Sequence, residues 1–313
     1  MTPAIFLHHY PGSPFAEKAR LMLGYKGLIW QSVFIPMVMP KPDVVALTGG
    51  YRKTPILQIG ADIYCDTALI AEKLEELQPA PALFPAGGQG LARTVAQWAD
   101  SSLFWAAVAY STQPAGMAQM FEKAPAEALQ SFAADRKAMS AGAPSLRPAD
   151  ATSAYRTYLD RLDDMLSSAG PYLLGDRPCI ADFSAYHPLW FTRKQTPALA
   201  GVIEERSLLT AWMDRMAAIG HGQVQRSSSQ AAIEQAGAQP PAAVDAGSFQ
   251  NDHGLALGSR VTVAAESFGT EATEGVLVAA APGRYTLARE DERAGRVHVH
   301  FPRIGYVLRA VRS

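Results

Sequence analysis

A serine stands where a helix is expected to begin, in the stretch YPGSPFAEKARLML (residues 10–23). Ser13 fits the N-cap position and Pro14 fits the first helical position. Such a helix start presents free N–H groups and the positive end of the helix dipole to an anion. An ordinary structural cap would explain the same residues. The stretch therefore indicates either a plain cap or a site for a negatively charged group.

A thiolate is an anion that this helix start could stabilise. A cysteine-type thiol ionises at about pH 8.5, and lowering that pKa by about two units takes roughly 2.7 kcal/mol. A helix end contributes about 0.3–2 kcal/mol, and a hydroxyl that donates to a charged sulfur contributes about 1.5–3 kcal/mol. We therefore expect Ser13 to stabilise the sulfur of a substrate as a hydrogen-bond donor, not to act as a nucleophile.

Three other short motifs place charged, hydroxyl-bearing or proline residues beside expected strands and helices. In CDTALIAEKL, Asp66 can accept from an ammonium group, and Thr67 with the helix start behind it can take a carboxylate. An N-cap aspartate explains that motif equally well. In PKPDVV, Lys41 can hold a carboxylate, although a plain loop lysine is the simpler interpretation. In RKTPIL, the Thr54–Pro55 step either starts a strand or forms a cis peptide bond.

These residues need a small sheet with helices beside it. Apolar runs at residues 4–7 and 30–35 predict strands, and a hairpin is expected about the turn at residues 60–62. Amphipathic helices are expected after Ser13 and over residues 67–77. The resulting order, β-α-β followed by β-β-α, predicts one mixed α/β domain over residues 1–84.

Two different regions follow this domain. Residues 90–222 show apolar positions three and four apart, which predicts a helical domain. Residues 223–254 are rich in small residues and proline, and we expect a mobile linker there. Residues 255–313 alternate apolar and polar positions in short runs, which predicts a small all-β barrel. The expected fold class is α+β.

Composition limits the classes of function. The 313 residues include 48% hydrophobic residues and carry a net charge of −1, which argues against a polyanion-binding protein. The two cysteines, Cys65 and Cys179, cannot form a disulfide framework or a cysteine-based zinc site. We see no secretory signal and no apolar run long enough to cross a bilayer. We expect a cytoplasmic protein with no membrane, metal or nucleic-acid partner.

The motifs together resemble a known family. SPFAEKARLMLGYKGL resembles the start of a cytosolic glutathione transferase and is closest to the omega-class pattern, with Ser13 in place of the cysteine. The resemblance covers about residues 4–222 and implies a thioredoxin-like domain followed by an all-α domain. LLGDRPCIADFSAYHPLW resembles a folding element of that second domain. Cys179 stands where a capping hydroxyl usually stands, and Asp182 is the aspartate three residues later.

The resemblance implies roles for the other motifs. It implies that Pro55 is cis and that the backbone of Thr54 pairs with the cysteinyl part of glutathione. It further implies that Asp66 and Thr67 hold the γ-glutamyl end and that Lys41 contacts the glycyl carboxylate. Glutathione would be the co-substrate, and a homodimer is usual in the family.

The expected function is a serine-type glutathione transferase that directs the glutathione thiolate at a small electrophile. Thiol exchange through a mixed disulfide needs a sulfur at the helix start, and Ser13 does not supply one. The expected apolar wall for the electrophile consists of Tyr10, Phe15, Trp105 and Tyr110. Because fold does not guarantee activity, a non-catalytic binding or assembly module, whose C-terminal barrel contacts a partner, remains the alternative.

Overall fold

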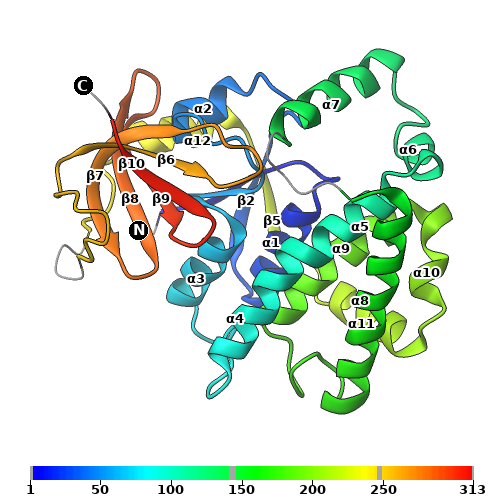
Figure 1. The fold of residues 1–313 in the computed structure, drawn as a ribbon. Coiled ribbons are helices and arrows are strands. Elements are labelled where there is room, and N and C mark those ends of the chain that lie inside the picture. The colour runs from blue at the N-terminus through cyan, green and yellow to red at the C-terminus, as the bar shows by residue number, and fades with distance from the viewer. Residues whose placement is uncertain (1–2, 141–145, 245–248, 312–313) are drawn as a thin grey trace.

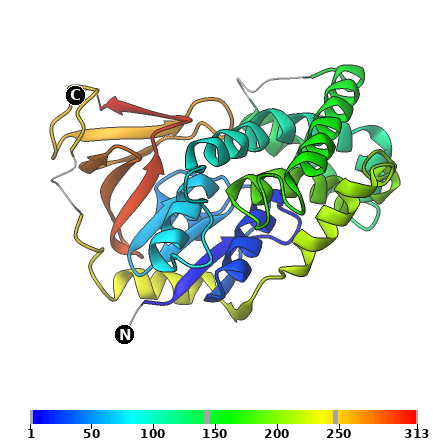
Figure 2. The same ribbon diagram turned by 90° about the horizontal axis from the view of Figure 1, so that it is seen from below.

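The computed structural model describes residues 3–140, 146–244 and 249–311. Parts of the predicted domains, residues 1–2, 141–145, 245–248 and 312–313, lie outside the described residues. The strands form one ten-stranded sheet, in which the C-terminal strands continue the N-terminal ones beyond one edge; the large helical domain lies on the opposite side of the N-terminal part (Figures 1 and 2). In Figure 2 the blue N-terminal part lies between the orange and red C-terminal strands and the green helical part.

The N-terminal domain has the expected order of elements. They are β1 (Ile5–His9), α1 (Pro14–Tyr25), β2 (Ile29–Phe34), α2 (Pro42–Thr48), β3 (Ile56–Ile59), β4 (Asp62–Cys65) and α3 (Thr67–Leu77). Strand β1 pairs parallel with β2 and antiparallel with β3, and β3 pairs antiparallel with β4. This is the thioredoxin-like arrangement, and the prediction for this part of the fold is confirmed.

The helical domain packs against one face of that sheet. Its elements are α4 (Gln89–Trp98), the π-helical turn η1 (Ala99–Leu103), α5 (Phe104–Ser111), α6 (Pro114–Met120), α7 (Ala126–Met139), α8 (Pro148–Ala169), α9 (Ile180–Gln195), the 3-10 turn η2 (Pro197–Leu199), α10 (Gly201–Glu204) and α11 (Ser207–Ala218). Helix α9 is the central helix, since it packs against α1, α4, α5 and α11. Among the helices described, none is both long and apolar enough to cross a membrane.

The segment expected to be a linker carries secondary structure. Strand β5 (Gln223–Ser227) pairs parallel with β2, and α12 (Ser229–Gly237) follows it. The indole of Trp30 donates to the carbonyl oxygen of His221 over 2.9 Å, which fixes the chain just before β5. Helix α12 buries Ala232 and Ile233. The small residues that favoured a linker instead form a narrow helix that lies close against the sheet.

The C-terminal strands continue the N-terminal sheet. They are β6 (Arg260–Ala265), β7 (Thr273–Ala281), β8 (Arg284–Asp291), β9 (Gly295–Pro302) and β10 (Tyr306–Ala310). Neighbours among them pair antiparallel, and β9 pairs parallel with β4 through Ile63 and Val299. The strand order is β10-β6-β7-β8-β9-β4-β3-β1-β2-β5. The expected additional β-strands are therefore present, but they join the first domain edge to edge and do not stand apart behind a linker.

Two apolar cores lie on opposite faces of the central sheet. Leu7 belongs to the core shared with the helical domain, whereas its neighbour Phe6 belongs to the core shared with α2, α12 and the C-terminal strands. Side chains alternate between faces along a strand, so a sheet buried on both sides needs apolar residues at successive positions. The short apolar run at the start of the chain meets that need.

Asp182 joins the parts of the helical domain. Its Oδ1 accepts from the backbone N–H of Leu173 and from the indole of Trp212, each over 2.9 Å, and its Oδ2 accepts from the N–H of Cys179 over 2.9 Å. Asp182 is 0% exposed. Cys179, at the N-cap of α9, is itself buried.

Replacing Asp182 should therefore destabilise the protein strongly. Asp182→Ala leaves buried donors without acceptors, and we expect a loss of about 3–5 kcal/mol in the free energy of unfolding. Asp182→Asn keeps one acceptor oxygen and should lose less. Urea unfolding followed by circular dichroism measures both. Equal and small losses for the two variants would contradict this role for Asp182.

Candidate functional site

Ser13 is the N-cap of α1. Its Oγ accepts from the backbone N–H of Ala16 over 3.2 Å, and Pro14 occupies the first turn. The hydroxyl group belongs to a residue that is only 2% exposed, so the space next to it is screened from bulk water. Electrostatic interactions are stronger in such an environment. The geometry is that of a cap whose hydroxyl still carries a proton to donate.

Tyr10 lies next to this hydroxyl. Burial raises the pKa of Tyr10, and the charge of Arg136 together with a hydrogen bond to Ser13 opposes the rise. Arg136, from α7, donates to the Tyr10 hydroxyl over 3.4 Å and to the carbonyl oxygen of Met37 over 3.1 Å. The hydroxyl groups of Ser13 and Tyr10 are therefore neighbours, and a guanidinium group stands beside them.

Lys41 connects Tyr10 to the Thr54–Pro55 step. The Lys41 ammonium lies 5.9 Å from the centre of the Tyr10 ring and donates to Oγ1 of Thr54 over 3.4 Å. The Thr54–Pro55 peptide bond is cis, as the family resemblance implies. Lys41 is 3% exposed, and within the described residues it forms no ion pair. Burial, followed by the charges of Arg136 and Arg52, lowers the pKa of Lys41 to about 8.

Asp66 and Thr67 begin α3. Oδ1 of Asp66 accepts from the N–H of Ala68 over 2.9 Å, and Asp66 has φ 77°, a left-handed value that is rare outside glycine. Oγ1 of Thr67 accepts from Nζ of Lys18 over 3.1 Å, and that lysine pairs with Asp100 over 2.6 Å. Asp66 is thus partly open, whereas the Thr67 hydroxyl is held by a buried network.

A buried arginine fastens two covering segments to this region. Arg52, 6% exposed, pairs through Nη2 with Asp135 of α7 and through Nη1 with Glu271 of the β6–β7 loop, the latter over 2.8 Å. The backbone N–H of Met39 also donates to Asp135, over 3.0 Å. The N–H of Gly269 in the same loop donates to the carbonyl oxygen of Met139 over 2.9 Å. Helix α7 and the β6–β7 loop therefore meet over the loops that carry Lys41 and Thr54.

The expected apolar wall is brought together only in part. Phe15 packs on Phe104, with ring centres 4.6 Å apart, and Phe104 packs on Trp105 over 5.1 Å. Trp105 also meets Phe268 of the β6–β7 loop over 5.0 Å. Tyr110, in contrast, packs on Tyr155 and donates to the carbonyl oxygen of Leu199 over 3.1 Å. These contacts tie Tyr110 to the helical domain, so the structure gives it a packing role and does not group it with Phe15 and Trp105.

Some residues of this region could not be assigned to it from the sequence. Arg136 comes from a helix that showed no motif, and Lys53 and Arg52 gave only a local excess of positive charge. Tyr306 lies in the segment predicted as a separate barrel, yet its hydroxyl donates to Oδ2 of Asp66 over 3.0 Å. Contacts between residues this far apart depend on the pairing of β9 with β4, for which the sequence carries no local signal.

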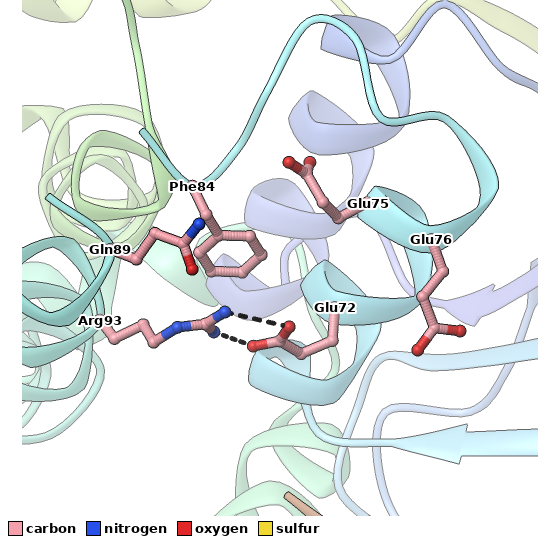
Figure 3. Close-up of a pocket in the computed structure, with 6 residues that line it drawn as sticks. All are labelled: Glu72, Glu75, Glu76, Phe84, Gln89 and Arg93. Atoms are coloured by element: carbon pink, nitrogen blue, oxygen red, sulfur yellow. Dashed lines mark hydrogen bonds and ion pairs between the residues drawn. The ribbon is translucent and has the colours of Figure 1, made fainter. Parts of the chain in front are cut away.

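Another hollow lies away from these residues. Figure 3 shows the six residues that line it, all from α3, α4 and the segment between them: Glu72, Glu75, Glu76, Phe84, Gln89 and Arg93. Arg93 pairs there with Glu72, and both side chains are about two-fifths exposed, at 42% and 41%. Across the described parts of the chain, no group of His, Cys, Asp and Glu is placed to hold a metal ion.

Lys41 should lower the free energy of unfolding of the ligand-free protein. Because its folded-state pKa is about 8 and the ordinary value is 10.5, the unfolded chain binds the proton more tightly, and wild-type stability should rise between these pH values. Lys41→Met should therefore raise the free energy of unfolding by about 1–3 kcal/mol at pH 7. The gain should shrink as the pH rises past 8. Urea titrations at neutral and alkaline pH measure this, and a Lys41→Met protein less stable at pH 7 would refute it.

The Arg52–Asp135 pair should matter more than an exposed pair. Asp135→Asn leaves Arg52 with only Glu271 as an anionic partner, and we expect a loss of about 2 kcal/mol. Glu72→Gln, which breaks the exposed pair of Figure 3, is the matched control and should change stability by less than about 0.5 kcal/mol. Thermal unfolding of both variants gives the comparison. Losses of similar size would mean that α7 is not held down through Asp135.

Comparisons with family models cover both domains. The model described as "Glutathione S-transferase, N-terminal domain" matches residues 7–82, and the one described as "Glutathione S-transferase, C-terminal domain" matches residues 72–215. No curated protein matches the sequence.

Solved structures extend the likeness to the whole chain. A GST-like protein from Pseudomonas syringae is 43% identical, with a TM-score of 0.81 over 99% of this chain and 100% of that one. A glutathione S-transferase from Sinorhizobium meliloti is 19% identical, with a TM-score of 0.52 over 68% of this chain and 87% of its own. A tau-class enzyme from mango, Mangifera indica, is 16% identical, with a TM-score of 0.51 over 69% and 89%. The last two show the fold alone. The chain belongs to the glutathione transferase superfamily.

Proposed function

We propose that this protein is a serine-type glutathione transferase that couples the sulfur of glutathione to a small electrophile. The observation that carries the proposal is a series of contacts from Ser13 through Tyr10 and Lys41 to Thr54, in which the buried Lys41 ammonium forms no ion pair within the described residues. A buried cation without a partner is unfavourable. An anionic peptide that binds here would relieve it.

Ser13 and the first turn of α1 would act on the sulfur. The hydroxyl accepts from Ala16 and lies within hydrogen-bond reach of Tyr10, so its proton would turn from that tyrosine to a thiolate, and the N–H groups of the helix start would add positive potential. The thiol proton would leave to solvent, the sulfur would form a bond to an electrophilic carbon, and the leaving group would carry away the electron pair. No general base is required, because the thiolate is already the favoured form.

The remaining predicted residues would hold the ends of the tripeptide. The backbone of Thr54, next to cis Pro55, would pair with the cysteinyl unit, and Lys41 would take the glycyl carboxylate. Asp66, partly open and at the start of α3, would accept from the γ-glutamyl ammonium. The electrophile would lie near Phe15 and Trp105, where aromatic rings gather.

Binding would require α7 and the β6–β7 loop to move away from the site. Ser13 is almost fully buried, and the segments that cover its neighbours are fastened through Arg52. The reacting sulfur would then be enclosed once the segments return. Enclosure strengthens the interaction between a thiolate and the helix start because it excludes water.

Removal of the Ser13 hydroxyl tests the proposal. Ser13→Ala should lower kcat/KM for glutathione conjugation roughly 10- to 100-fold, because a hydrogen bond to a charged atom is lost. Ser228→Ala is the matched control. Ser228 caps α12 in the same way, accepting from the N–H of Ala231 over 3.1 Å, so both variants lose a cap but only one should lose activity.

Spectrophotometric assays with 1-chloro-2,4-dinitrobenzene and other small electrophiles, together with retention on immobilised glutathione, supply the readout. Retention without turnover by any electrophile would favour the non-catalytic binding module. No retention at all would contradict the glutathione site itself.

A further inference from the structure

Tyr306 brings the C-terminal sheet to the start of α3. Its hydroxyl donates to Oδ2 of Asp66 over 3.0 Å, while Oδ1 of the same carboxylate accepts from the N–H of Ala68. The Tyr51 hydroxyl lies 3.4 Å from that of Tyr306. Both oxygens of Asp66 are therefore oriented by fixed donors, and the carboxylate keeps lone pairs for one more.

The same tyrosine also contacts a cation. Nζ of Lys53 lies 4.9 Å from the centre of the Tyr306 ring and 5.8 Å from that of Tyr51. Lys53 forms no ion pair within the described part of the chain, although the negative charge of Asp66 acts on it. Ring faces attract an ammonium group without neutralising its charge. Tyr306 thus touches an acid through its hydroxyl and a base through its ring.

Tyr306 is a fixed part of this arrangement. It is 5% exposed, and its ring packs on Phe301 with centres 5.7 Å apart. Its backbone pairs with Ala265 of β6. These contacts fix the Tyr306 side chain, so we expect it to stay in place when a ligand binds.

We propose that Tyr306 is a positioning residue that keeps Asp66 and Lys53 apart, so that they receive the ammonium and the carboxylate of the zwitterionic α-amino-acid end of a γ-glutamyl peptide. This inference rests on the proposed function. Asp66 accepts from the ammonium, and Lys53 donates to the carboxylate. The sequence assigned that carboxylate to the Thr67 hydroxyl, which accepts from Lys18 and keeps its own proton to donate. Lys53 adds the positive charge that a hydroxyl cannot supply. Without the tyrosine ring, Lys53 and Asp66 would be free to pair with each other, and the site would neutralise itself.

Calorimetric titration of the full chain with three peptides tests whether Asp66 binds the ammonium and Lys53 binds the carboxylate. The peptides are glutathione, glutaryl-cysteinyl-glycine, which lacks the α-ammonium, and 4-aminobutyryl-cysteinyl-glycine, which lacks the α-carboxylate. Lys53→Met should weaken glutathione binding about tenfold and leave the 4-aminobutyryl peptide unaffected. Tyr306→Phe keeps the ring but loses the hydroxyl; it should weaken glutathione binding about three- to tenfold and leave the glutaryl peptide unaffected.

Tyr285→Phe is the matched control. Tyr285 is a buried tyrosine of β8 whose ring packs on Arg303 and His253, and its replacement should leave all three affinities unchanged. If the wild-type protein does not bind glutathione, the proposed function and this inference both fall. If it binds and both Lys53→Met and Tyr306→Phe bind all three peptides as the wild type does, this inference alone is overturned. Tighter binding by Tyr306→Phe would also overturn it, because the tyrosine would then be an obstruction.

Discussion

Burial of two lysines that form no ion pair within the described residues is the constraint that shapes this site. Lys41 donates to Thr54 and Lys53 lies over the Tyr306 ring, and neither forms an ion pair within the described residues. Burial lowers the pKa of each, because it makes the charged form less favourable than it is in water. In the proposed function, the carboxylates of a bound peptide would neutralise these two charges.

The pairing of β9 with β4 decides what surrounds those charges. That one parallel contact places the C-terminal sheet beside the thioredoxin-like domain, and with it Tyr306 next to Asp66 and Glu271 next to Arg52. The same placement gives the second face of the central sheet its cover. Since the Pseudomonas syringae protein is similar over 99% of this chain, its likeness includes these strands. The added sheet is thus structurally continuous with the candidate site.

The sequence predicts those features that depend on neighbouring residues. Ser13 before Pro14 and Asp66 before Thr67 both begin helices, as their chemistry favours. Features that depend on distant partners were missed or misplaced. The segment with α12 and β5 was expected to be a linker because small residues, taken alone, indicate mobility; pairing with β2 supplies the order. His300 alternates with apolar residues along β9, yet its side chain is buried against Tyr64 and Asp62.

The measurement that addresses the sulfur most directly is the thiol pKa of glutathione bound to the protein. Ultraviolet difference absorbance of the thiolate, followed against pH in the wild type and in Ser13→Ala, gives this value. We predict that the bound thiol ionises about two units below a free thiol in the wild type, and that most of this shift disappears without the hydroxyl. A bound thiol with the same pKa in both proteins would contradict the role assigned to Ser13.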